Sequence, residues 1–163
     1  MKDNLTQKEK TTTASPTATT DDDSPGSGAN HSVRFLVRHP SADLSFLGVL
    51  TGMSPNLSWA KGAERRMPSG KLLSGTHPDS LWSHTSRLGH SSPAAAIEQW
   101  LVNIERAAEQ FEGIKKEGGT LSLYFDLDGR QNIGDVFSPG LLGRLAALGI
   151  ELGIEVFPNR EFE

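Results

Sequence analysis

Residues 92–127, SPAAAIEQWLVNIERAAEQFEGIKKEGGTLSLYFDL, decide the fold, because a helical period changes to a strand period within a few residues. Ser92 and Pro93 stand in the order typical of a helix start. Apolar side chains then recur every three or four residues, which predicts one helix over 94–117 that ends at a pair of glycines. From Leu121 onward every second residue is apolar, which predicts a strand.

The flanking sequence predicts shorter elements of the same two kinds. Apolar side chains that alternate with charged ones indicate strands, and Ser or Gly residues bound the helices. The predicted strands cover 33–39, 58–61, 81–87 and 150–156, and the predicted helices cover 41–52 and 139–148. Segment 54–92 is rich in Gly and Pro, so we expect a long exposed loop between its two strands.

This pattern predicts an α+β fold, a two-layer sandwich in which a mainly antiparallel sheet carries its helices on one face. A sheet covered on both faces would lose the alternation that these strands show. Trp100 and Phe111 lie on the apolar side of the long helix, and we expect both to be largely buried. The opposite face of the sheet is expected to be open and to carry Arg34, Leu36, Arg38, Tyr124 and Glu155.

The composition divides the chain into two parts. Residues 1–30 are rich in Thr, Ser and Asp and contain Leu5 as almost their only sizeable apolar side chain. Such a segment cannot bury enough apolar surface to offset the entropy of ordering it, so we expect a disordered tail. Residues 31–163 are expected to form a single α+β domain.

Charge and composition exclude several classes of protein. The net charge of −4 argues against nucleic-acid binding, which normally needs a basic face. The chain has no cysteine, so disulfides, thiolate nucleophiles and Cys-type zinc sites are excluded. No apolar run is long enough to span a bilayer, and the N-terminus lacks the apolar core of a signal peptide. We therefore expect a cytoplasmic protein without membrane contact.

The motifs that suggest catalysis are incomplete. Asp126 and Asp128, in LSLYFDLDG, resemble the first motif of the haloacid-dehalogenase phosphatases, but the chain beyond them lacks the lysine and the acidic metal-binding pair of that family. We expect instead that the strand ends there and that Asp and Gly form a turn. No metal-site spacing occurs among the histidines, which are His31, His39, His77, His84 and His90. The sequence therefore predicts no catalytic residue, no metal and no cofactor.

One loop concentrates positive charge in this acidic chain. Arginine and lysine beside aromatic rings can hold an anion or a planar group. The candidate ligand or partner-binding residues are Trp59, Lys61, Arg65, Arg66, His77, Trp82 and His84, and Lys71 adds to the charge. The alternative is that the charges are merely solvated and the tryptophans only anchor the loop on the core.

The order of these motifs resembles a bacterial family, catalogued as domain of unknown function 4279, over residues 32–158. Its most specific features are the Lys61-Gly62 turn, the Trp82-Ser83 pair and the helix end LAALG at 145–149. Segment 39–53 fits the family only loosely, and the N-terminal tail is extra. The resemblance implies an α+β fold and brings with it no activity and no catalytic residue.

Two classes of function stay open. The first is a binding or interaction module, such as an accessory or immunity-type protein, with an unknown protein partner. The second is a small enzyme or an anion-binding or ligand-binding protein that uses the region of Lys61–Arg66, Trp82 and His84. The first is favoured because no catalytic set is present. Self-association is compatible with both.

Overall fold

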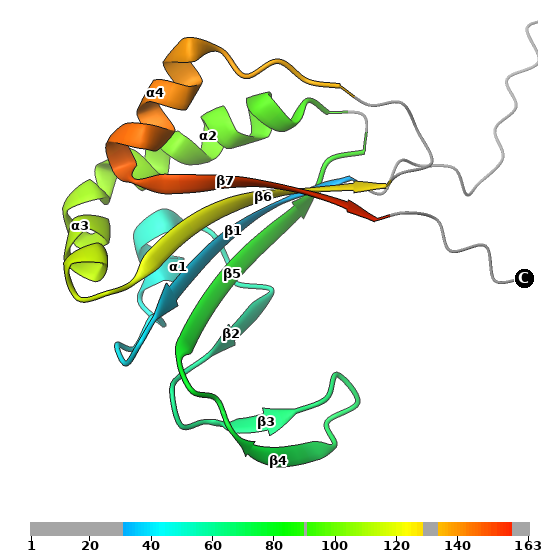
Figure 1. Cartoon of the computed structure of the whole chain (residues 1–163), viewed down its shortest axis with the longest axis vertical. Coiled ribbons are helices and arrows are strands. Elements are labelled where there is room, and N and C mark those ends of the chain that lie inside the picture. Colours follow the sequence, from blue (N-terminus) through cyan, green and yellow to red (C-terminus); the bar gives the residue numbers. More distant parts are fainter. Residues whose placement is uncertain (1–30, 90, 129–133, 158–163) are drawn as a thin grey trace, which may run out of the picture.

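The computed structural model describes residues 31–89, 91–128 and 134–157. Its main feature is a five-stranded sheet in the order β2-β5-β1-β6-β7 (Figure 1). Neighbouring strands are antiparallel except for β6 and β7, which are parallel because α4 lies between them in the chain. The strands are β1 (Ser32–His39), β2 (Leu57–Trp59), β5 (Ser80–Arg87), β6 (Thr120–Asp128) and β7 (Ile150–Phe157).

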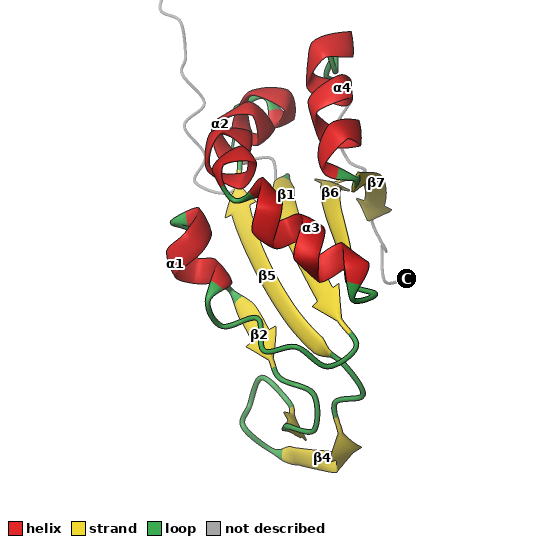
Figure 2. Cartoon of the chain, turned by 90° about the vertical axis from the view of Figure 1, so that its left-hand side faces the viewer, coloured by secondary structure: helices red, strands yellow, loops and turns green. Residues whose placement is uncertain are grey.

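Four helices lie on one face of this sheet (Figure 2). They are α1 (Leu47–Thr51), α2 (Pro93–Arg106), α3 (Ala108–Lys116) and α4 (Pro139–Leu148). The predicted α+β fold, with a mainly antiparallel sheet and its helices on one face, is therefore confirmed.

The core lies between the sheet and the helices. Alternate residues of β1 and β6 point into it, while the helices contribute one residue per turn. Its members include Val33, Phe35, Val37, Ile97, Leu101, Ile104, Phe111, Leu121, Leu123, Leu141 and Leu145. The side chains between them on β1 and β6 lie on the other face, and this alternation is the one that the sequence displays.

The prediction of one helix over 94–117 is wrong, because α2 and α3 meet at a break at Ala107. Ala107 has φ −102° and ψ 16°, outside the helical region. A straight helix of that length would extend about 36 Å, whereas an eight-residue strand spans about 26 Å. The break lets both helices pack on the sheet (Figure 2). Phe111 is buried, as expected, but Trp100 is only half-buried.

The segment expected to be a loop contains a second, two-stranded sheet. It is a hairpin of β3 (Glu64–Arg66) and β4 (Leu72–Thr76), which projects beyond the ends of β2 and β5 (Figure 1). Gly70 forms part of its turn with φ 84°, a left-handed conformation that glycine adopts without a steric cost. All residues of both strands are exposed, so the hairpin adds nothing to the core.

Three predictions lie outside the described residues. These are the disordered tail at 1–30, any role of His90 and the turn expected at Gly129. Within the described part of the chain, no helix is long and apolar enough to cross a membrane.

Candidate functional site

The candidate site lies at the base of the β3–β4 hairpin. Trp59 ends β2, and His77 directly follows β4. Their rings stack, with 4.2 Å between the centroids and 16° between the planes. The Gly62 N–H donates to the His77 carbonyl at 2.8 Å, and the His77 N–H donates to the Ala63 carbonyl at 2.9 Å. These backbone bonds hold the two segments in register and fix the stacked pair.

A hollow of about 450 Å³ lies beside this aromatic pair. Its volume falls within the range of ordinary small-ligand sites. The residues that line it are Arg38, Trp59, Arg65, Thr76, His77, Pro78 and Asp79. Three of the seven residues predicted from the sequence, Trp59, Arg65 and His77, therefore meet at one surface.

An ion pair forms part of the wall of this hollow. Arg38 Nη1 lies 2.8 Å from Asp79 Oδ2. Burial opposes ionisation of Asp79, but Arg38 and the neighbouring Trp59 side chain outweigh it and hold the pKa of Asp79 below its ordinary value. Asp79 is therefore ionised at neutral pH and offsets the charge of Arg38.

The three basic residues predicted for the site differ in their surroundings. The Lys61 side chain is exposed, and the Lys61 N–H donates to Ser80 Oγ at 2.9 Å. Arg66 pairs with Glu64 at 2.8 Å. Arg65 lines the hollow and has no acidic partner among the described residues, so its charge is uncompensated.

Trp82 and His84 lie away from this surface. They are paired across the ladder with Val37 and Phe35, so their side chains share the helix-covered face of the sheet. Trp82 is fully buried, and its ring contacts that of Phe35 edge-on at 6.0 Å. His84 Nδ1 lies 2.7 Å from the Ser54 carbonyl, and its ring contacts Trp100. Because alternate residues of a strand share a face, the sequence already indicated that Trp82 and His84 lie together on one side of the sheet.

Four residues that line the hollow, Arg38, Thr76, Pro78 and Asp79, were not among the predicted site residues. Arg38 was expected only on the open sheet face, and it reaches the hollow because β1 pairs with β5, with Arg38 opposite Leu81. The sequence did not mark Asp79 as a site residue, because its role depends on the ion pair with Arg38, which lies 41 positions away.

A second polar group lies on the open face of the sheet. Arg34 Nη2 is 3.1 Å from Asp126 Oδ1 and 2.7 Å from Glu155 Oε2, and Ser32 Oγ donates to Asp126 at 3.0 Å. Burial raises the pKa of Asp126, although Ser32 and Arg34 favour its ionised form; Glu155 raises it further. β6 ends at Asp128, where the strand was expected to end, and the turn expected at Gly129 lies outside the described residues.

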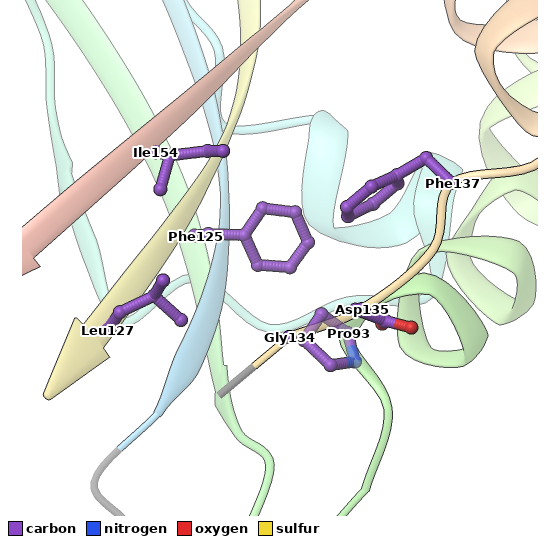
Figure 3. A pocket seen from close by; sticks show the side chains of 7 residues that line it. All are labelled: Pro93, Phe125, Leu127, Gly134, Asp135, Phe137 and Ile154. Atoms are coloured by element: carbon purple, nitrogen blue, oxygen red, sulfur yellow. The ribbon is translucent and has the colours of Figure 1, made fainter. Parts of the chain in front are cut away.

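An apolar cavity of about 140 Å³ lies at the far end of β6 and β7 (Figure 3). Phe125 and Phe137 meet edge-on across it at 5.0 Å, and Leu127, Ile154 and Pro93 complete the apolar lining. The carboxylate of Asp135 at its border accepts hydrogen bonds from Ser92, Ala94 and Val136. The Asp135 carboxylate is therefore already satisfied by hydrogen bonds within the chain.

Comparison with known proteins gives no relative. No family model, no curated protein and no solved structure matches this chain. Within the described residues, no group of three His, Asp or Glu side chains is placed to hold a metal ion.

Proposed function

We propose that this domain is a binding module that recognises an anionic group of a partner protein in the hollow beside Trp59 and His77. One observation carries the proposal: an unpaired Arg65 stands at the same hollow as a fixed, stacked aromatic pair. A guanidinium beside an aromatic wall is a common arrangement in protein recognition sites. We also propose that the chain belongs to the family of domain of unknown function 4279, a relationship that implies no activity.

The charges around the hollow favour an anion over a cation. Arg38 is offset by Asp79 and Arg66 by Glu64, so Arg65 and Lys61 supply the net positive charge. Exposed charges of this kind contribute little to folding, and salt screens their interaction with a ligand. Binding through them therefore depends on ionic strength, while the stability of the domain does not.

The alternative of a small enzyme in this region has less support. It would need Lys61, Trp82 and His84 to converge on one substrate. Trp82 is fully buried, and His84 lies on the helix-covered face of the sheet. No geometric observation favours catalysis by these residues.

The test compares Arg65→Ala with Arg66→Ala, which remove the same charge from adjacent positions. A fluorescein-labelled glutamate-rich peptide is titrated at low salt, and a partner captured from native lysate is titrated in the same way. Arg65→Ala should weaken binding roughly two- to fivefold, because an exposed charge pair has a free energy of that order. Arg66→Ala should weaken it less, since Arg66 is already paired.

The triple change of Lys61, Arg65 and Arg66 to Ala should leave the urea midpoint nearly unchanged. A captured partner that binds this triple variant with unaltered affinity at low ionic strength would show that the hollow is not its binding site.

A further inference from the structure

β7 is an edge strand with a free side. It is the last strand in the order β2-β5-β1-β6-β7, and within the described residues it pairs only with β6 (Figure 1). In a parallel pair, every second residue of the outer strand directs its backbone N–H and C=O away from the neighbouring strand. β7 therefore presents a row of backbone donors and acceptors that another extended segment could bond.

The helix-facing side of β7 is apolar and only partly covered. α4 packs over the beginning of the strand, where Ile150 is buried and Leu152 is half-buried. Further along, Ile154 is 62% exposed and Val156 is 58% exposed. Ile154 also borders the apolar cavity of Figure 3. An added strand would bring alternate side chains beside Ile154 and Val156 and cover them.

The other side of β7 is acidic. Glu151 and Glu155 point to the open face, and β7 contains no Lys or Arg. Glu155 is held by Arg34 at 2.7 Å. Glu151 accepts a hydrogen bond from Ser122 at 3.2 Å and has no cationic partner among the described residues. A basic side chain on an added strand would supply the missing positive charge.

We propose that the free edge of β7 binds an extended segment of a partner protein in which apolar and basic side chains alternate. The apolar side chains would lie over Ile154 and Val156, and the basic ones would face Glu151. Backbone bonds would supply affinity, and the alternation would supply specificity. A second copy of β7 fits less well because it brings no cation to Glu151. This edge is separate from the hollow at Arg65, so either proposal can fail alone.

The probe is a fluorescein-labelled peptide of alternating lysine and valine, titrated into the full chain and followed by fluorescence anisotropy. It should bind, and a peptide of alternating glutamate and valine should bind at least about tenfold more weakly. N-methyl groups on two adjacent central residues remove a donor from each edge of the peptide, so they should abolish binding. Equal binding of the N-methylated peptide would overturn strand addition.

Substitutions in the chain test whether the peptide binds at the edge of β7. Ile154→Asp and Val156→Asp change exposed side chains and should each weaken binding about tenfold or more. Val49→Asp is the matched control, because Val49 is 92% exposed in α1 and should leave binding unchanged. Glu151→Lys should weaken binding, and Glu109→Lys, on the exposed side of α3, should do so less.

Three outcomes contradict the proposal. The first is that no alternating peptide binds, and the second is that the β7 variants and the Val49 control bind it alike. The third is light scattering that finds a dimer in the unmodified chain and a monomer in Ile154→Asp, because a second copy would then occupy the edge.

Discussion

Trp82 in β5 and Trp100 in α2 differ in burial. Trp82 is fully buried and contacts Phe35, whereas Trp100 is half-buried at the border of the core, where it contacts His84. The loss of a buried aromatic ring removes packing and leaves a cavity. A half-buried ring loses less, because solvent can enter the space.

We therefore expect Trp82→Ala to lower the free energy of unfolding by about 3–5 kcal/mol. Trp100→Ala should lower it by about 1–2 kcal/mol, in proportion to its smaller buried area. Urea unfolding of both variants measures the difference. An equal or larger loss for Trp100→Ala would mean that Trp100 contributes to the core as much as Trp82 does.

Asp126 should give the stability of the domain a particular pH dependence. Burial raises its pKa in the folded state, with Glu155 adding to the effect, so folding favours the protonated form. The stability that this group contributes is present below its unfolded pKa and is lost as the pH rises through its folded pKa. Asp126→Asn cannot ionise, so it should gain stability relative to the unmodified chain as the pH rises from acidic to neutral. Urea midpoints across that range test the sign, and a relative loss would contradict it.

At the scale of single elements, α2 is capped by a residue from a distant part of the chain. Ser92 accepts a hydrogen bond from the Ala95 N–H, as its position predicted. Asp135 adds a second cap, because its carboxylate accepts from the Ala94 N–H and from Ser92 Oγ, both at 2.7 Å. A carboxylate at a helix N-terminus also interacts favourably with the helix dipole.

Asp135→Ala should cost about 1–2 kcal/mol, the range of a lost N-cap. Burial opposes ionisation of Asp135, but the bonds from Ala94, Ser92 and Val136 outweigh it and hold its pKa below the ordinary value. A depressed folded pKa gives stability that is present above the unfolded pKa and is lost as the pH falls through the folded pKa. Thermal unfolding should therefore give the unmodified chain a higher melting temperature than Asp135→Ala at neutral pH. The two melting temperatures should converge in acid. A difference that grows in acid would exclude this role.

Two glycines should respond oppositely to the same change. A Cβ on Gly153 would come 2.5 Å from the Tyr124 ring, which lies across β7, whereas a Cβ on Gly143 in α4 would meet nothing within 4 Å. Gly143→Ala should therefore stabilise the domain by about 0.5–1 kcal/mol, because alanine restricts the unfolded chain. Gly153→Ala should destabilise it by about 1–3 kcal/mol, since the ring must move. Chemical denaturation of both variants would show whether the signs are opposite.

At the scale of the whole molecule, the sheet and its four helices share one core. The buried residues of β1, β6, α2, α3 and α4 belong to one contiguous cluster. The β3–β4 hairpin lies outside it, with every residue of its strands exposed. The hairpin can therefore change without loss of the core, which suits a segment that borders a binding surface.

The shared core predicts one cooperative unfolding transition. Tryptophan fluorescence, to which the buried Trp82 contributes, and far-ultraviolet circular dichroism should give the same urea midpoint. Deletion of the hairpin tip, residues 67–71, should leave that midpoint nearly unchanged, because the tip is exposed. Separate midpoints for the two signals would mean that sheet and helices unfold independently.

The sequence by itself determined the kinds of element and the faces that they bury. The alternation in β1, β6 and β7 and the helical spacing around Ile97 and Leu101 are local patterns, because strand and helix geometry fix which neighbouring side chains share a side. They were enough to predict the α+β class and the single layer of helices. The same local patterns could not predict the break at Ala107, which depends on how a long helix fits the sheet beneath it.

Only the tertiary structure decided which distant residues meet. The Trp59–His77 stack, the Arg38–Asp79 ion pair and the Asp135 cap all join positions far apart in the chain. Each depends on strand order and register, and a shift of one residue would move every side chain of a strand to the opposite face. Register is set by the packing of the whole core, so the hollow could be only partly predicted from the basic loop.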